Sequence, residues 1–250
     1  MAKPTGYVIE RGDGLLAHRP IPVVAIAMLP AYPSRANVKT GPALTISYMP
    51  VDEPPHIAAH ASGLDEAVCG DCKMRPLSPS PAKDGCYVIK MTGILNMWKH
   101  FTDGGYPDAD EDAYVKMAQA EFVRFGGWGD SACLPPGHVE RFADIPKRAG
   151  YTHQWMRSIG AHLRRWMMAS CDSPEERTHA KDMGWRSFRV RLPGEKLLKG
   201  EIDCPYPRVQ CCDCGACDGA VRGRRKPDIS VEAHGVVHKI AAIRRYREAS

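Results

Sequence analysis

The spacing of apolar residues changes repeatedly along the chain beyond residue 42, and each change predicts a new strand or helix. The run ALTISYMP at 43–50 is typical of a buried strand that ends at a proline. Tyr114, Ala118 and Phe122 recur every four residues, as on one face of a helix. The segment that follows, FVRFGGW, alternates like a strand and breaks at its glycines. A strand, a helix and a second strand are therefore expected in this order.

Two further helices are expected from spacing and from end signals. Segment 87–101 carries apolar residues at helical spacing. Segment 137–150 ends in Lys147 and Arg148 followed by Gly150, a typical stop signal for a helix.

The second half of the chain continues this alternation. Strands are expected at 151–156, 166–171, 185–192 and 228–235, with a helix-like segment at 157–165. Ser173 is placed to cap another helix, with Pro174 at the first helical position and Glu176 completing a capping box. Alternating strands and helices favour a parallel sheet with right-handed crossovers. We therefore expect an α/β fold, a partial or complete (β/α) barrel of about six to eight parallel strands. An open doubly wound sheet is the alternative.

Three segments follow from this pattern. Residues 1–42 are rich in proline and glycine and show no clean period, which predicts an irregular N-terminal segment. Residues 43–200 hold the barrel-like core, including a cysteine loop at 69–86. Residues 201–250 form a basic, cysteine-rich segment that we expect to bind metal.

Composition is that of an ordinary globular protein, with 44% hydrophobic and 25% charged residues. The net charge of +5 permits a polyanionic partner without requiring one. The apolar run IPVVAIAMLPAY is too short and too broken by prolines to cross a bilayer. We therefore expect a cytoplasmic protein with no membrane partner. In that compartment, the ten cysteines favour metal binding over disulfides.

The stretch CCDCGACDG at 211–219 carries the strongest metal signal. One ligand set combines Cys212, Cys214 and Cys217 with His234, a Cys₃His zinc site. The other combines Cys204, Cys211, Cys214 and Cys217, a Cys₄ site for zinc or for an iron–sulfur cluster.

A second set of cysteines lies after the first predicted strand of the core. Cys69 and Cys72 have the two-residue spacing that presents two thiolates to one metal, and Cys86 follows thirteen residues later. The fourth position is open to His56, to His60, to water or to substrate. Thiols without metal are the alternative.

Polar residues at predicted strand ends are the catalytic candidates, because sites in parallel α/β folds form there. Asp130 follows Gly126 and Gly127, which let the backbone approach a ligand closely, and could act as nucleophile, general base or base-reading acceptor. The alternative is a glycine turn with a surface aspartate. Arg124 has the side-chain parity to face a barrel interior, with Asp130 or a substrate phosphate as its partner.

Four more residues complete this candidate site. His153 is expected to act as a general acid or base, and Gln154 and Arg189 to contact substrate. Asp172 is a further catalytic candidate. The structural alternatives are a hydrogen-bonded histidine on an aromatic strand, and an aspartate that only supports the start of a helix.

Two basic runs flank the C-terminal cysteines and could form an edge that contacts phosphates. Their residues are Arg222, Arg224, Arg225 and Lys226 in the first run, and Arg244 and Arg245 in the second. A solvated surface is the alternative.

The pattern Cys212-x-Cys214-x2-Cys217 followed by His234, after a run of β/α units, resembles the zinc motif of the queuine tRNA-ribosyltransferase family. Phage relatives in that family insert 7-deazaguanines into DNA. The resemblance implies a zinc-stabilised α/β barrel and a transglycosylase reaction. In that reaction an aspartate attacks the ribose, guanine leaves and a deazaguanine base enters. We expect a phage-encoded enzyme that modifies DNA rather than tRNA, with Asp130 as the nucleophile by its position.

Two alternative functions stay open. Cysteines after the first strand and a Gly-Gly segment after the second are similar to the radical S-adenosylmethionine fold, which implies an iron–sulfur enzyme acting on a nucleotide or nucleic acid. The segment CGDCKMRPLSPSPAKDGCYV also looks like that of small phage proteins. The other alternative is not enzymatic, a zinc-stapled nucleic-acid-binding protein with basic flanks.

Overall fold

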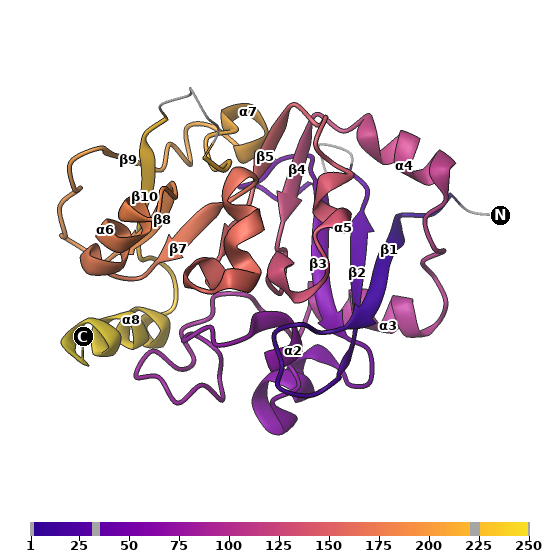
Figure 1. The fold of residues 1–250 in the computed structure, drawn as a ribbon, viewed down its shortest axis with the longest axis horizontal. Coiled ribbons are helices and arrows are strands. Elements are labelled where there is room, and N and C mark those ends of the chain that lie inside the picture. Colours follow the sequence, from indigo (N-terminus) through magenta and orange to yellow (C-terminus); the bar gives the residue numbers. More distant parts are fainter. Residues whose placement is uncertain (1–2, 32–35, 221–225, 250) are drawn as a thin grey trace.

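The computed structural model describes residues 3–31, 36–220 and 226–249. These residues form an α/β fold built on two five-stranded sheets, with helices and long loops packed around them (Figure 1). The α/β class expected from the alternating pattern is confirmed, and most strand pairs are parallel.

The first sheet has the order β1-β2-β3-β4-β5. Its strands are β1 (Gly6–Asp13), β2 (Pro22–Met28), β3 (Leu44–Pro50), β4 (Phe122–Phe125) and β5 (Lys147–Ala149). The β1–β2 and β2–β3 pairs are antiparallel, whereas β3–β4 and β4–β5 are parallel. The expectation of an irregular segment over residues 1–42 is therefore wrong. β2 lies between two strands and is buried along most of its length, so its apolar run does not alternate.

The second sheet is parallel throughout, with the order β6-β7-β8-β10-β9. Its strands are β6 (Tyr151–Thr152), β7 (Met168–Cys171), β8 (Ser187–Arg191), β9 (Glu201–Asp203) and β10 (Asp228–Glu232). Gly150 alone separates β5 from β6, so the two sheets adjoin there. A side chain at Gly150 would come within 2.9 Å of the Met167 Cβ, which explains the glycine at this junction.

Four of the eight α-helices in the described residues, α3 to α6, lie within segments expected to be helical, but their lengths differ, and the other four were not expected. The eight helices are α1 (Pro55–Ile57), α2 (Glu66–Cys69), α3 (Gly93–Thr102), α4 (Glu111–Ala118), α5 (Gly137–Glu140), α6 (Pro174–Asp182), α7 (Cys211–Cys214) and α8 (Val237–Ala249). A π-helical turn covers Ala58–Ser62, and 3-10 turns cover Ser131–Cys133, Gln154–Met156 and Ser158–Arg165. Ser173 caps α6 as expected, since its Oγ accepts a hydrogen bond from the Glu176 N–H at 3.1 Å.

The long helix expected at 137–150 is wrong. α5 ends at Glu140, and Lys147–Ala149 pairs with β4 as strand β5. Pro146 disfavours a helical conformation for the residue before it, so the chain can leave the helix and enter the sheet. Similarly, the helix expected at 87–101 begins only at Gly93.

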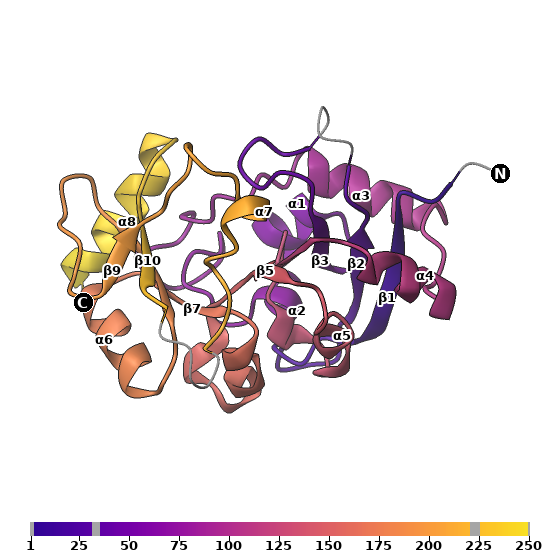
Figure 2. The same ribbon diagram turned by 90° about the horizontal axis from the view of Figure 1, so that it is seen from above.

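The C-terminal helix α8 lies beside the cysteine loop in both ribbon views (Figure 1 and Figure 2). Ile243 of α8 belongs to a small apolar cluster with Met74 and Ala82 of that loop. Arg245 donates hydrogen bonds to the carbonyls of Pro81 and Lys83. None of the helices in the described part of the chain combines the length and apolarity needed to span a bilayer.

Candidate functional site

The connections that leave β3, β4, β6 and β7 meet at one edge of the sheets, because these parallel strands point the same way. We call this the carboxyl edge. It receives the cysteine loop after β3, the glycine segment after β4, His153 after β6 and Asp172 after β7. Two hydrogen bonds tie the connections together. The Asp130 N–H donates to the Val68 carbonyl at 2.6 Å, and the His153 N–H donates to Asp130 Oδ2 at 2.9 Å.

Cys69, Cys72 and Cys86 lie near one another at this edge, although they are not arranged around a common metal position, and we call them the three-cysteine group. Burial raises the pKa of the Cys69 thiol well above its usual value, and Asp65 and then the nearby Cys72 and Cys86 raise it further. The loop closes on itself through the Cys86 N–H, which donates to the Met74 carbonyl at 3.0 Å. Gln154 holds its start, since Nε2 donates to the Cys69 carbonyl at 3.0 Å. Gln154, expected to bind substrate, therefore positions the cysteine loop.

His153, whose side chain is 25% exposed, pairs with the buried Asp172 beside the three-cysteine group. His153 Nε2 lies 3.2 Å from Asp172 Oδ2, and the Cys72 side chain also interacts with the imidazole. Burial acts to lower the pKa of His153, but Cys72 and then Asp172 outweigh it and hold this pKa well above its ordinary value. Burial acts to raise the pKa of Asp172, but His153 and Lys73 outweigh it and lower this pKa. The side chains of His153 and Asp172, both catalytic candidates from the sequence, therefore face one another.

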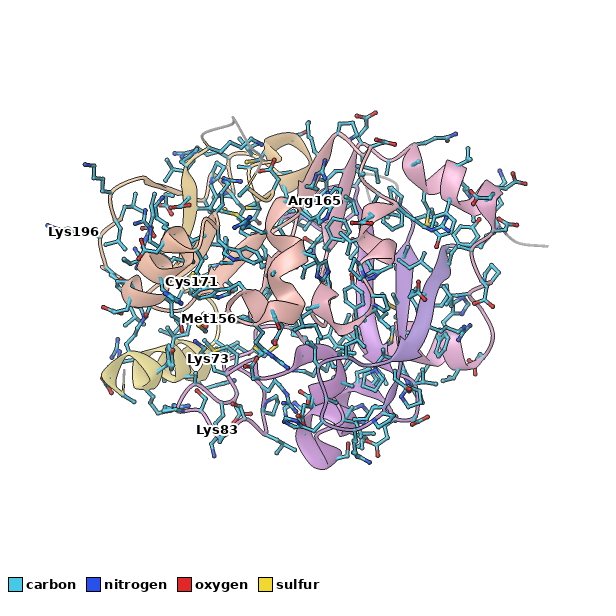
Figure 3. The ribbon with its side chains drawn as sticks, in the orientation of Figure 1. Lys73, Lys83, Met156, Arg165, Cys171 and Lys196 are labelled. Atoms are coloured by element: carbon cyan, nitrogen blue, oxygen red, sulfur yellow. The ribbon has the colours of Figure 1, made fainter. Side chains whose placement is uncertain are left out.

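Lys73 connects this pair to two helices. Its Nζ lies 3.8 Å from Asp172 Oδ2, donates to the carboxylate of Glu176 and lies 2.8 Å from the Tyr246 hydroxyl. The Tyr246 hydroxyl in turn donates to Glu176 Oε1 at 2.6 Å. Lys73 thus lies between the end of β7 and α8 (Figure 3). These three residues join the cysteine loop, α6 and α8 into one charged cluster, and sequence reasoning missed them because their partners are distant along the chain.

Asp130 does not have the exposed position expected of a nucleophile. Its side chain is buried, and its carboxylate accepts hydrogen bonds from the Thr152 hydroxyl at 2.9 Å, the His153 N–H at 2.9 Å and the Ala132 N–H at 3.0 Å. Burial raises the pKa of Asp130 above its usual value. Because both oxygens are engaged, Asp130 joins the end of β4 to the end of β6.

The glycines before Asp130 allow close packing rather than an approach to a ligand. The Gly127 N–H donates to the Ile46 carbonyl at 2.8 Å, which lays this segment along β3. A Cβ at Gly127 would collide with Ser47 Oγ and lie 2.9 Å from Thr45 Cγ2. Gly126 has a φ of 73°, a conformation that glycine adopts without strain.

Arg189, expected to bind substrate, is fully buried in an ion pair. Its Nε and Nη2 each lie 2.7 Å from an oxygen of Glu201, a bidentate arrangement. Glu195 accepts from the same guanidinium. This ion pair joins β8 to β9. A ligand would bind the guanidinium only by displacing Glu201 or Glu195 from it.

Arg124 and Tyr151 lie on an accessible face of the strands. Both are half-buried, whereas their chain neighbours Val123 and Thr152 point to the opposite face and are fully buried. The Tyr151 ring packs on Phe188, with ring centroids 4.1 Å apart. Arg124 forms no hydrogen bond or salt bridge with any residue that the structure describes. Asp130, expected as a partner of Arg124, is instead bonded to the Thr152 hydroxyl and to two backbone N–H groups.

The C-terminal cysteines of the Cys₄ set line one pocket, and the residues found only in the Cys₃His set do not. One pocket, which we call the four-cysteine pocket, is lined by Cys204, Cys211, Cys214 and Cys217 together with Tyr151 and Phe188. Cys212 packs against Gly41 instead. His234 is exposed beyond the end of β10. Within residues 3–31, 36–220 and 226–249, no three His, Cys, Asp or Glu side chains are already arranged to hold a metal ion.

The structure describes only part of the expected basic edge. Arg222, Arg224 and Arg225 lie outside the described residues. Lys226 forms a salt bridge with Asp218 at 2.5 Å. Arg244 and Arg245 are exposed on α8, beside the cysteine loop.

Comparison with protein-family models, with curated proteins and with solved structures gave no match.

Proposed function

We propose that this chain is an iron–sulfur enzyme that acts on a nucleotide or nucleic acid, with Cys69, Cys72 and Cys86 as the cluster ligands. The observation that carries the proposal is the proximity of three thiols at the carboxyl edge, beside the partly buried His153–Asp172 pair. Sites in α/β folds form at this edge.

The chemistry of the three-cysteine group fits a metal centre. Cys72 and Cys86 lie close enough to Cys69 to affect the pKa of its thiol, and a metal ion that binds all three replaces their protons. Thiolates are soft donors that suit iron–sulfur clusters and zinc. Three protein thiolates leave one metal position for substrate, as open catalytic sites do. A bound cluster would supply one-electron chemistry.

The order of features along the chain supports iron–sulfur over zinc at this group. β3 leads into the cysteines and β4 leads into Gly126 and Gly127, an arrangement similar to the radical S-adenosylmethionine fold. We extend the proposal to a partial barrel formed by the parallel strands from β3 to β10. The spacing of two and thirteen residues between the cysteines differs from the Cys-x3-Cys-x2-Cys of that fold. We therefore assign no role to S-adenosylmethionine.

The chain's own residues serve the centre in two ways. Asp172 fixes the His153 ring, which is the group placed to hold or release a proton beside Cys72. Lys83, Arg244 and Arg245 are exposed around the cysteine loop and its covering helix. This local positive charge favours an anionic substrate, and a polynucleotide would contact several of these residues at once.

Asp130, the nucleophile expected for base exchange, already accepts hydrogen bonds from the Thr152 hydroxyl and from the N–H groups of Ala132 and His153. Its carboxylate is therefore not free to attack a ribose. A transglycosylase would need another carboxylate free to attack ribose. We therefore keep base exchange and the non-enzymatic zinc protein as outcomes that the experiments below can identify.

The three-cysteine ligand set is tested by single Ala variants at Cys69, Cys72 and Cys86, purified without oxygen. Each should lose most of its iron and acid-labile sulfide and its brown colour. Cys133→Ala and Cys171→Ala are matched controls, because both thiols are fully buried in the main core and belong to neither cysteine group. Loss of iron in the controls to the same degree would show a folding defect rather than ligation, and full iron in all three variants would refute the ligand set.

The substrate class is tested by DNA binding over a range of salt concentrations. Arg244→Gln should weaken binding and reduce the slope of log affinity against log salt by about one. Lys116→Gln is the control, since Lys116 is exposed on α4, at the opposite end of the molecule from α8 (Figure 1). A salt-independent affinity, or equal effects of the two variants, would contradict a phosphate contact at Arg244.

A further inference from the structure

Three separate segments bring four thiols to the junction of the two sheets. Cys204 follows β9, and its N–H donates to the Ser230 carbonyl of β10 at 2.8 Å. Cys211 and Cys214 lie on α7. Cys217 follows α7, and its carbonyl accepts from the N–H of Gly150 at 3.2 Å. The backbone therefore holds all four positions around the four-cysteine pocket, independently of any ligand.

The size and the lining of the pocket indicate which kind of ligand fits it. Its volume is about 30 Å³, close to the share of one water molecule and far below that of an organic ligand. The four cysteines supply soft sulfur donors. Lys39 also lines the pocket. Lys39 and Arg124 both lie close enough to Cys211 to act against the burial that raises the pKa of its thiol. Two nearby cations offset the excess negative charge of a divalent ion bound by four thiolates.

Neither Cys212 nor His234 lines this pocket. The Cys212 N–H donates to the Thr40 carbonyl at 3.0 Å and its sulfur packs against Gly41, although Cys212 contacts the same small apolar cluster as Cys211 and Cys217. Ile229 of β10 lines the pocket, whereas His234 is exposed beyond the end of this strand. The Cys₃His set suggested by the sequence resemblance is therefore not assembled.

We infer that Cys204, Cys211, Cys214 and Cys217 form a Cys₄ site for one tetrahedral zinc-class ion, separate from the three-cysteine group. The site is structural, because four protein ligands leave no open position. Binding joins the segment 204–217 to β5 and β6 and keeps Tyr151 on the accessible face, where its hydroxyl donates to Cys217. The four side chains rotate toward a common point when the ion binds, since they are not arranged around one in its absence.

The inference goes beyond the proposed enzyme and does not depend on it. Zinc content per chain is measured in Ser variants of Cys204, Cys211, Cys214 and Cys217. Each should lose about one equivalent of zinc, as expected for the loss of one ligand from a four-ligand site. Cys212→Ser and His234→Ala are the matched controls and should keep the wild-type zinc content. Iron at the three-cysteine group should stay unchanged in all six variants, which separates failure of this inference from failure of the proposed function.

A second measurement guards against variants that do not fold. Cobalt added to metal-free wild-type protein should give intense thiolate-to-metal absorption and the bands of a tetrahedral ion, and Cys212→Ser and His234→Ala should give the same spectrum. A weaker thiolate band in Cys212→Ser, or loss of the spectrum in His234→Ala, would overturn the Cys₄ assignment in favour of Cys₃His. Iron and sulfide in place of zinc at these cysteines would overturn the single-ion assignment.

Discussion

The imidazole of His153 and the carboxylate of Asp172 lie 3.2 Å apart, although they follow different strands of the second sheet. Both side chains turn toward the cysteine loop that follows β3 of the first sheet. The pair therefore links the connections from three strands at the carboxyl edge.

Removing the Asp172 carboxylate should destabilise the protein. Only 3% of its side chain is exposed, and it is shared by His153 and Lys73. Asp172→Asn should lower the free energy of unfolding by about 3 kcal/mol, because the partly buried imidazole of His153 loses its carboxylate partner, whereas Lys73 keeps Glu176. Urea denaturation measures this change. Asp182→Asn, at an exposed position on α6, is the control. Equal losses of unfolding free energy in the two variants would show that the contacts of Asp172 with His153 and Lys73 do not stabilise the protein.

Asp130→Asn tests whether Asp130 is structural. An amide offers one acceptor oxygen and two N–H donors, so it cannot satisfy the Thr152 hydroxyl and the two backbone N–H groups together. The expected loss in free energy of unfolding is about 1–3 kcal/mol. Exposed Asp144→Asn should have no comparable effect. An Asp130→Asn protein as stable as wild type but inactive in base exchange would instead restore Asp130 as a nucleophile.

The contact between Gly127 and Ser47 predicts a non-additive pair of substitutions. Gly127→Ala forces a methyl group against Ser47 Oγ and should cost about 1–3 kcal/mol. Ser47→Ala should be close to neutral, since its buried hydroxyl has no hydrogen-bond partner among the described residues. The double variant should recover part of the loss, because the colliding oxygen is gone. Strictly additive free energies of unfolding would contradict this contact.

His138 predicts a loss of stability in mild acid. Burial lowers the pKa of His138 to about 4, below the value of about 6.5 expected in the unfolded chain. Its Nε2 lies 3.0 Å from the Tyr48 hydroxyl, and its Nδ1 lies 2.5 Å from the Pro135 carbonyl oxygen. Between these two pKa values the unfolded chain binds more protons, so stability falls as the pH decreases from 6.5 to 4.

The size of this effect is on the order of 3 kcal/mol across that range. His138→Gln removes the titrating group and should flatten this part of the dependence, even though its stability at neutral pH is lower. The measurement is the free energy of unfolding at several pH values for both proteins. Parallel curves for wild type and His138→Gln would exclude His138 as the source.

Local signals predicted the parts of the structure that depend on neighbouring residues. The cap at Ser173 follows from three residues that lie within one turn of α6. The position of Asp172 follows from the end of a predicted strand, because parallel strands share an edge. His153 was expected within a strand at 151–156, but β6 ends at Thr152 and leaves His153 just beyond it.

Contacts between residues far apart along the chain determined the features that local sequence patterns could not predict. Lys147–Ala149 joins β4 because its backbone pairs with a strand more than twenty residues earlier, which overrides the helical spacing before it. Arg189 is neutralised by Glu201, and nothing in the spacing of these two residues indicates a bidentate pair. The choice between two cysteine sets likewise depends on β9, which carries Cys204 to the pocket.

An iron–sulfur cluster at the three-cysteine group would remain bound in wild-type protein purified without oxygen. Iron, acid-labile sulfide and zinc per chain are measured in that protein. We expect iron and sulfide in equal amounts, in brown protein, together with zinc held by the four-cysteine pocket. Colourless protein that contains zinc but neither iron nor sulfide would contradict the cluster assignment and return base exchange as the leading function. Protein without any of these elements would contradict both metal sites.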